Sequence, residues 1–84
     1  MAYSGYKNWE TWNVCLWFDN DRGLYDSVRE YPGRFNAAKA KDFVLEIFPE
    51  GTPDMKELSR AELHTAYAKV SWSEVSKNFN EAKK

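Results

Sequence analysis

The chain has 84 residues, enough for one domain with one hydrophobic core, and its 4 Trp, 5 Tyr and 5 Phe supply the large side chains that so small a core needs. An apolar content of 43% and a formal net charge of −1 exclude an intrinsically disordered chain. The 12 basic and 13 acidic residues are mixed along the sequence, without the positive cluster of a non-specific DNA binder or the negative excess of a DNA mimic.

Cysteine content and hydropathy indicate the compartment. The single cysteine, Cys15, excludes an internal disulfide and favours a reducing environment. The N-terminus contains no apolar signal core, and no run approaches the roughly 20 apolar residues of a membrane span. We therefore expect a cytoplasmic protein without a membrane segment.

The first helix is expected over residues 9–18. Asn8 is a suitable N-cap, because its side-chain oxygen can accept a backbone N–H that the first turn leaves without a partner. Residues 1–7 form a lead-in, from which Tyr3 or Tyr6 is expected to pack back on the domain.

The helical period places four large apolar side chains on one broad face of this helix, namely Trp9, Trp12, Leu16 and Trp17. Val14, Cys15 and Phe18 lie on its other sides. A helix that is apolar almost all round is usually touched by several neighbours. We therefore place this helix at the centre of the fold and assign Trp12, Leu16 and Cys15 to the core.

Two further helices follow in chain order. Residues 19–21 end the first helix and cap a short second one, which Pro32 and Gly33 terminate. A third helix over residues 35–48 has a wide apolar face opposite charged positions. Residues 49–53 contain two prolines and a glycine, and are expected to form a loop.

Capping boxes of the form Ser-x-x-Glu at residues 59–62 and 71–74 predict the starts of two more helices. The polar tail, residues 80–84, is expected to fray. The sequence thus predicts an all-α fold, a small single domain over residues 1–84. It is expected to be a bundle of about five short helices around the tryptophan-rich first helix.

Three features could carry chemistry, and each has a simpler structural interpretation. The stretch from Asp19 to Glu30 resembles half of a calcium-binding EF-hand loop, but Gly23 stands at a ligand position, so helix capping is favoured. The only histidine, His64, lacks a second His or a Cys to share a metal, and is expected to be a solvated helix residue. Apolar neighbours make Cys15 a small core residue rather than a nucleophile. We expect no catalytic residue, metal or cofactor.

Asn13 projects between Trp9 and Trp17 on the aromatic face. A buried amide must find hydrogen-bond partners, so one interpretation is that Asn13 ties the helix to a neighbouring backbone. The alternative is that part of this face stays open. In that case Trp9, Asn13 and Trp17 are the candidate partner-binding residues, because tryptophan is enriched at binding hot spots.

The segment from Asn8 to Tyr25 resembles the signature N-W-E-T-W-N-V-x-L-W-x-x-N-D-x-G-L-Y of an uncharacterised family of small proteins from bacteriophages and bacteria. The T-P-D turn at residues 52–54 and the W-S-E-V run at residues 72–75 are similar to later parts of that family. Cys15 departs from the small residue, such as Ala, expected there, which supports a packing role. The resemblance implies no activity or cofactor. It does imply a setting, because small phage proteins often bind a host protein.

Together these observations favour a non-catalytic binding module that acts through protein–protein interaction with a host factor, and they predict a contiguous exposed apolar patch. The alternative is a small nucleic-acid-binding regulator, because rings interleaved with basic residues occur in single-strand binders. However, five acidic residues flank the aromatic segment as well as the basic Lys7, Arg22 and Arg29. A helical homo-oligomer with a structural role is a third hypothesis.

Overall fold

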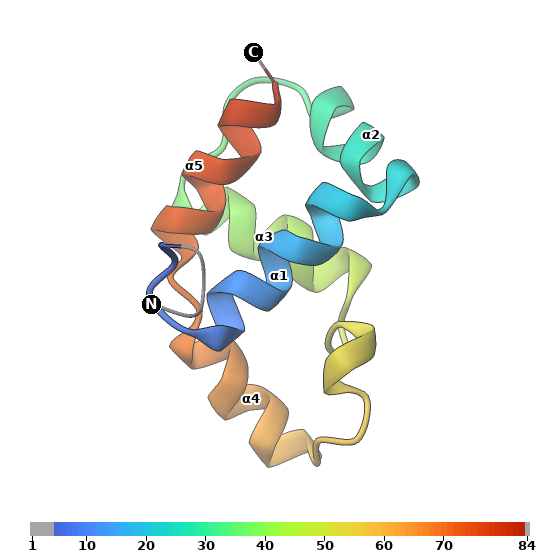
Figure 1. Cartoon of the computed structure of the whole chain (residues 1–84), viewed down its shortest axis with the longest axis vertical. Coiled ribbons are helices and arrows are strands. Elements are labelled where there is room, and N and C mark those ends of the chain that lie inside the picture. The colour runs from blue at the N-terminus through green and yellow to red at the C-terminus, as the bar shows by residue number, and fades with distance from the viewer. Residues whose placement is uncertain (1–4, 84) are drawn as a thin grey trace.

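Five α-helices and one short 3-10 helix form the regular structure of residues 5–83, which are the residues described by the computed structural model (Figure 1). In chain order they are α1 (Trp9–Asn20), α2 (Arg22–Glu30), α3 (Ala37–Ile47), η1 (Pro53–Met55), α4 (Arg60–Lys69) and α5 (Trp72–Ala82). No strand occurs within residues 5–83, so the all-α prediction is confirmed. In this part of the chain, no helix combines the length and apolar character needed to cross a bilayer.

Each α-helix begins at a side chain that accepts the backbone N–H of the third helical residue; the caps are Asn8, Asp21, Asn36, Ser59 and Ser71. Such a cap contributes about 1 kcal/mol. Ser59 and Glu62 form both halves of the predicted capping box. At α5 only one half forms, because the Glu74 carboxylate accepts the backbone N–H of Lys7 at 2.9 Å. This glutamate therefore joins the lead-in to α5.

The helix boundaries differ slightly from those predicted. α1 continues to Asn20. α3 begins after Asn36, which caps it, and leaves Phe35 in the preceding loop as a buried core residue. The predicted loop over residues 49–53 leads into η1, which buries Met55. The burial of Phe35 and Met55 in the core therefore determines the start of α3 and the presence of η1, which helical periodicity does not predict.

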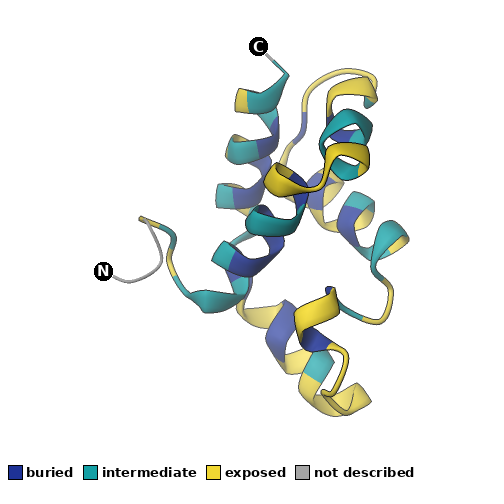
Figure 2. Cartoon of the chain, turned by 45° about the vertical axis from the view of Figure 1, so that its right-hand side comes forward, coloured by how far each residue is buried: buried dark blue, intermediate teal, exposed yellow. Residues whose placement is uncertain are grey.

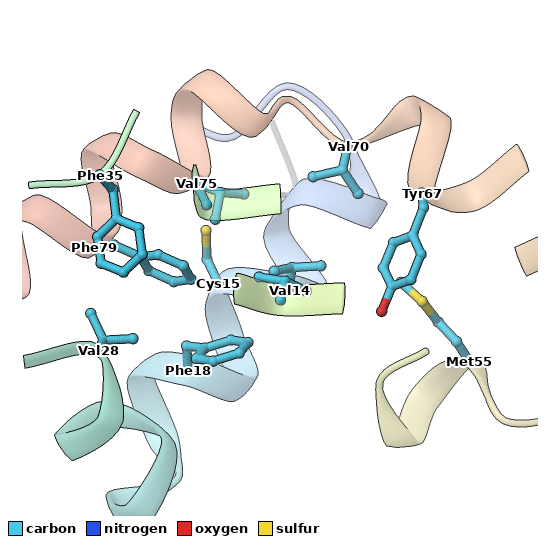
Figure 3. Close-up of a cluster of buried hydrophobic side chains, with 12 residues drawn as sticks. Val14, Cys15, Phe18, Val28, Phe35, Met55, Tyr67, Val70, Val75 and Phe79 are labelled. Carbon is cyan, nitrogen blue, oxygen red and sulfur yellow. The ribbon is translucent and has the colours of Figure 1, made fainter. Parts of the chain in front are cut away.

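Figure 1 shows α1 crossing in front of α3, with α2 and α5 beside its upper part and α4 below it. α1 contacts α2, α4 and α5, while α3 packs against α5. Phe18 of α1 lies among three other rings, with centroid distances of 5.8 Å to Phe43, 5.6 Å to Phe48 and 5.1 Å to Phe79. Their tilted and edge-on arrangements are favourable for aromatic rings. Figure 3 shows Phe18 and Val14 of α1 among the buried hydrophobic side chains of the core, which include Phe79.

The face of α1 that is buried differs from the predicted one. Five residues of α1 are at most 1% exposed: Thr11, Asn13, Val14, Cys15 and Phe18. The core assignment of Cys15 is confirmed, whereas Trp12 and Leu16, also predicted to be core, are only half-buried. Because α1 is apolar all round, periodicity could not select its inner face. The smaller side chains of Val14 and Cys15 allow α1 to approach its neighbours closely, as dense core packing requires.

Residues 80–82, which lie in the tail that is expected to fray, are helical in the structure. Asn80 accepts the backbone N–H of Phe35 at 2.8 Å and donates to its carbonyl at 3.0 Å. The Lys83 ammonium donates to carbonyls at the end of α2, including that of Arg29 at 3.2 Å and that of Tyr31. The last turn of α5 is thus joined to the α2–α3 connection, while residue 84 lies outside the described residues.

In the lead-in, residues 1–4, which include Tyr3, also lie outside the described residues. Tyr6 packs against the core, and its hydroxyl donates to Oδ1 of Asn78 in α5 at 3.0 Å. Most residues of α4 are exposed, and only Ala66 and Tyr67 of this helix are buried (Figure 2).

Candidate functional site

Asn13 is buried against a loop and is only 1% exposed. Its Nδ2 donates to Oδ2 of Asp54 at 2.6 Å, and its Oδ1 accepts a hydrogen bond from Oγ1 of Thr52 at 2.6 Å. Asn13 therefore ties α1 to the segment around η1 through side chains, not through a neighbouring backbone. Since these two partners cover the amide, Asn13 does not face solvent and is not itself available for contact with a binding partner.

Trp17 reaches the same carboxylate. Its indole Nε1 donates to Oδ2 of Asp54 at 2.9 Å, so one oxygen accepts hydrogen bonds from both Asn13 and Trp17. The hydrogen bond from Asn13 and, to a smaller extent, that from Trp17 favour the ionised carboxylate. They therefore hold the pKa of Asp54 below its ordinary value. Asp54 is exposed, so the carboxylate held by these donors is accessible from solvent.

We call Asn13, Trp17, Thr52 and Asp54 the Asp54 cluster. The sequence singles out Asn13 and Trp17, but it presents Thr52 and Asp54 only as parts of a turn motif. Thr52 is fully buried and stands just before η1, where Pro53 is the first residue of that short helix. This local pattern predicts a helical start. It contains no signal that the segment contacts α1.

Trp9 does not take part in the Asp54 cluster. It is half-buried and packs against the hydrophobic core. Of the three predicted partner-binding residues, the structure therefore brings together Asn13 and Trp17, and places Trp9 in a different environment.

The outer face of α1 lies away from Val14, Cys15 and Phe18 and carries Trp9, Trp12, Leu16 and Trp17, with the buried Asn13 between Trp9 and Trp17. All four are half-buried, so each keeps part of its apolar surface in contact with solvent. The only charged residues of α1 are Glu10 and Asp19, both acidic. Arg22, which follows the helix, pairs with Asp26 at 3.6 Å. The outer face is thus apolar with an acidic border, to which Asp54 adds a further carboxylate.

A second polar network positions the start of this face. Oδ1 of Asn8 accepts the hydroxyl of Thr11 at 2.7 Å, and Nδ2 of Asn8 donates to the carbonyl of Lys69 at 2.7 Å. The hydroxyl oxygen of Thr11 in turn accepts the backbone N–H of Ser71 at 2.8 Å. The first turn of α1 is therefore joined to the connection between α4 and α5.

The remaining candidates from the sequence occupy separate positions. Cys15 is fully buried, and burial raises the pKa of its thiol to about 12, whereas His64 is exposed on α4. Asp19 lies in the last turns of α1 and accepts a hydrogen bond from Asn78, while Asp21 caps α2. The capping role of Asp21 is confirmed. Within residues 5–83, no three His, Cys, Asp or Glu side chains gather closely enough to hold a metal ion.

Comparison with known proteins identifies the family but not the activity. The chain belongs to a family of unknown function, DUF7249, which matches residues 1–84. This agrees with the resemblance to an uncharacterised family. No curated protein and no solved structure gives a significant match.

Proposed function

We propose that this member of DUF7249 is a non-catalytic binding module that binds another protein through the outer face of α1. The observation that carries this proposal is that Trp9, Trp12, Leu16 and Trp17 all remain half-buried on one helix face. Each buried aromatic side chain removes about 150–250 Å² from water, so a small domain gains stability by covering its rings. Three tryptophans that remain partly exposed on one helix face are typical of a protein-binding surface, where tryptophan is enriched.

The charges around this face favour a protein partner over a nucleic acid. α1 has no Lys or Arg, while Glu10, Asp19 and Asp54 place carboxylates at its borders. Such an environment repels phosphates, whose neutralisation dominates binding to nucleic acids. It suits a protein surface that presents apolar side chains beside a lysine or arginine.

The wider setting of the proposal comes from the sequence signature. The segment from Asn8 to Tyr25 resembles that of small phage and bacterial proteins, which supports a host protein as the partner. A cytoplasmic site of action agrees with the lone cysteine, Cys15, which is buried and free.

The test is a comparison of two charge-introducing variants. Leu16→Glu places a carboxylate in the middle of the outer face, whereas Ala38→Glu places one at an exposed position of α3. The two variants and the wild type are used to capture partners from a bacterial lysate, and a captured protein is then purified and titrated. We expect Leu16→Glu to weaken its binding about tenfold or more, while Ala38→Glu binds like the wild type. Circular dichroism verifies that both variants are folded.

Two outcomes would contradict this proposal. Unchanged binding by folded Leu16→Glu would remove the outer face from the interface. Capture that nuclease treatment abolishes, with an affinity that falls steeply as salt rises, would instead identify a nucleic-acid-binding protein.

A further inference from the structure

A cleft lies on the side of the protein formed by α4 and the segment before it. It encloses about 580 Å³ and is lined by Pro49, Glu50, Lys56, Leu58, Arg60 and Leu63. We call it the α4 cleft. It does not include any residue of the outer face of α1, so it is a second, separate surface.

The walls of the α4 cleft are held in place by close packing and hydrogen bonds. Gly51, next to its lining residue Glu50, has a φ of 93°, and a Cβ there would lie 2.8 Å from Cδ1 of Leu63 and 2.9 Å from Cβ of Met55. Only glycine fits this close approach of the loop to α4. In addition, the hydroxyl of Tyr67 donates to the carbonyl of Phe48 at 2.8 Å. The cleft is therefore preformed, which reduces the entropy lost on binding.

The apolar part of the α4 cleft is unusually accessible. Leu58 is 38% exposed, and within residues 5–83 it is the most exposed of the large hydrophobic side chains. Leu63 lies beside it and is half-buried. Leu58 also lines a second hollow of about 280 Å³, together with Glu10 and Thr65. An apolar side chain of a ligand in the cleft would cover surface on Leu58 that the fold leaves in water.

The charged part of the cleft is predominantly basic. Lys56 and Arg60 are exposed, and neither forms an ion pair or side-chain hydrogen bond with another described residue. Arg60 is also the first residue of α4, where the helix dipole adds positive potential. Of the acidic groups nearby, Glu50 lines the cleft, Glu57 is exposed and follows Lys56 in the chain, and the carboxylate of Glu62 is engaged by the backbone N–H of Ser59 at 2.8 Å. The two unpaired cations therefore lie beside the accessible leucine.

We propose that the α4 cleft binds a short extended peptide segment of a partner protein. This peptide places an apolar side chain against Leu58 and Leu63, and acidic side chains beside Lys56 and Arg60. The charge of the cleft selects the occupant, because the exposed Lys56 and Arg60 attract carboxylates and can form charge-assisted hydrogen bonds with them. The proposal goes beyond the binding function assigned to α1, since it concerns a different surface and a ligand of opposite charge character.

The test uses the peptide acetyl-Glu-Asp-Leu-Asp-Glu-amide as the probe. Its binding to the full chain is followed by the NMR shifts of the Leu58 and Leu63 methyl groups. Two control peptides replace the acidic residues by Lys or the central Leu by Ser. We expect saturable shifts with the first peptide, and dissociation constants about tenfold or more weaker with both controls.

Paired variants locate the charge requirement. Lys56→Glu with Arg60→Glu is expected to weaken binding of the probe about tenfold or more. Lys39→Glu with Lys41→Glu makes the same charge change at exposed positions of α3 and should leave binding of the probe unchanged. Leu16→Glu also leaves it unchanged, which separates this result from the proposed role of α1. Thermal unfolding verifies that each variant is folded.

Several results would overturn the assignment of this cleft. The first is that the probe causes no saturable shifts at millimolar concentration. The second is that either control peptide binds as tightly as the probe. The third is that the α3 pair weakens binding of the probe as much as Lys56→Glu with Arg60→Glu does. Failure of the probe would leave the proposal for α1 standing, because the α1 test measures a different surface.

Discussion

Asn13 and Asp54 are 41 positions apart in the chain, yet Nδ2 of Asn13 donates to Oδ2 of Asp54 at 2.6 Å. The bond joins a buried amide on α1 to an exposed carboxylate in η1. Because Trp17 donates to the same oxygen, this one carboxylate holds the η1 segment against two successive turns of α1. The Asp54 cluster thus connects the proposed binding face of α1 with the loop that leads to the α4 cleft.

Replacement of Asp54 by alanine is expected to destabilise the protein. The change removes the acceptor of both Asn13 and Trp17, and the amide of Asn13 loses a partner in a buried position. We expect the free energy of unfolding in urea to fall by about 1–2 kcal/mol, since solvent at the exposed carboxylate reduces the effect.

Two comparisons test the cause of that loss. Glu57→Ala removes a nearby exposed carboxylate and should change the unfolding free energy little. Trp17→Phe keeps an aromatic ring but removes the indole donor, so the double variant with Asp54→Ala should be less destabilised than the sum of the two single effects. Strict additivity would show that the bond from Trp17 to Asp54 contributes nothing to stability.

The contribution of Asp54 depends on pH in a predictable direction. Its pKa is lower in the folded protein than in the unfolded chain, because the folded state donates two hydrogen bonds to the carboxylate. The stabilisation is therefore complete above the unfolded pKa of about 3.9 and is lost as pH falls through the lower folded pKa.

Asp19 acts in the opposite sense, because burial raises its pKa in the folded state. The measurement is therefore the difference in unfolding free energy between the wild type and Asp54→Ala, from which Asp19 cancels. We expect this difference to be constant from neutral pH to about pH 5, and to shrink on further acidification. A difference that grows as the solution becomes more acidic would contradict the assigned pKa direction.

Cys15 is expected to react slowly with thiol reagents in the native protein. The side chain is fully buried, and burial raises its pKa to about 12, so the reactive thiolate is scarce at pH 8. Reaction with a disulfide reagent, followed by absorbance, should be much slower in buffer than in denaturing urea. Equal rates in the two conditions would show that the α1 core opens readily.

Asn80 is expected to contribute more to stability than its place in a polar tail suggests. Asn80→Ala leaves the backbone N–H and carbonyl of buried Phe35 without their side-chain partner, which should cost about 2–3 kcal/mol. Asn80→Asp keeps the acceptor for the N–H of Phe35 and should cost less. The exposed Lys77→Ala on the same helix serves as a control in the urea titrations. Equal stability of wild type and Asn80→Ala would mean that the end of α5 frays in solution.

The sequence by itself determined the features that depend on local interactions. The caps Asn8, Asp21 and Ser59 each bond a backbone N–H three residues away, so residue type and spacing were sufficient to predict them. The all-α class follows from the same kind of information, because helical periodicity extends over only a few turns.

Only the tertiary structure decided which face of α1 is buried and what its polar side chains contact. α1 is apolar on all sides, so the burial of Val14 and Cys15 in place of Trp12 and Leu16 depends on how closely its neighbours can pack. The partners of Asn13 and the role of the tail have the same origin. Their hydrogen bonds join residues far apart in the chain. These residues come together only when the segments between them fold.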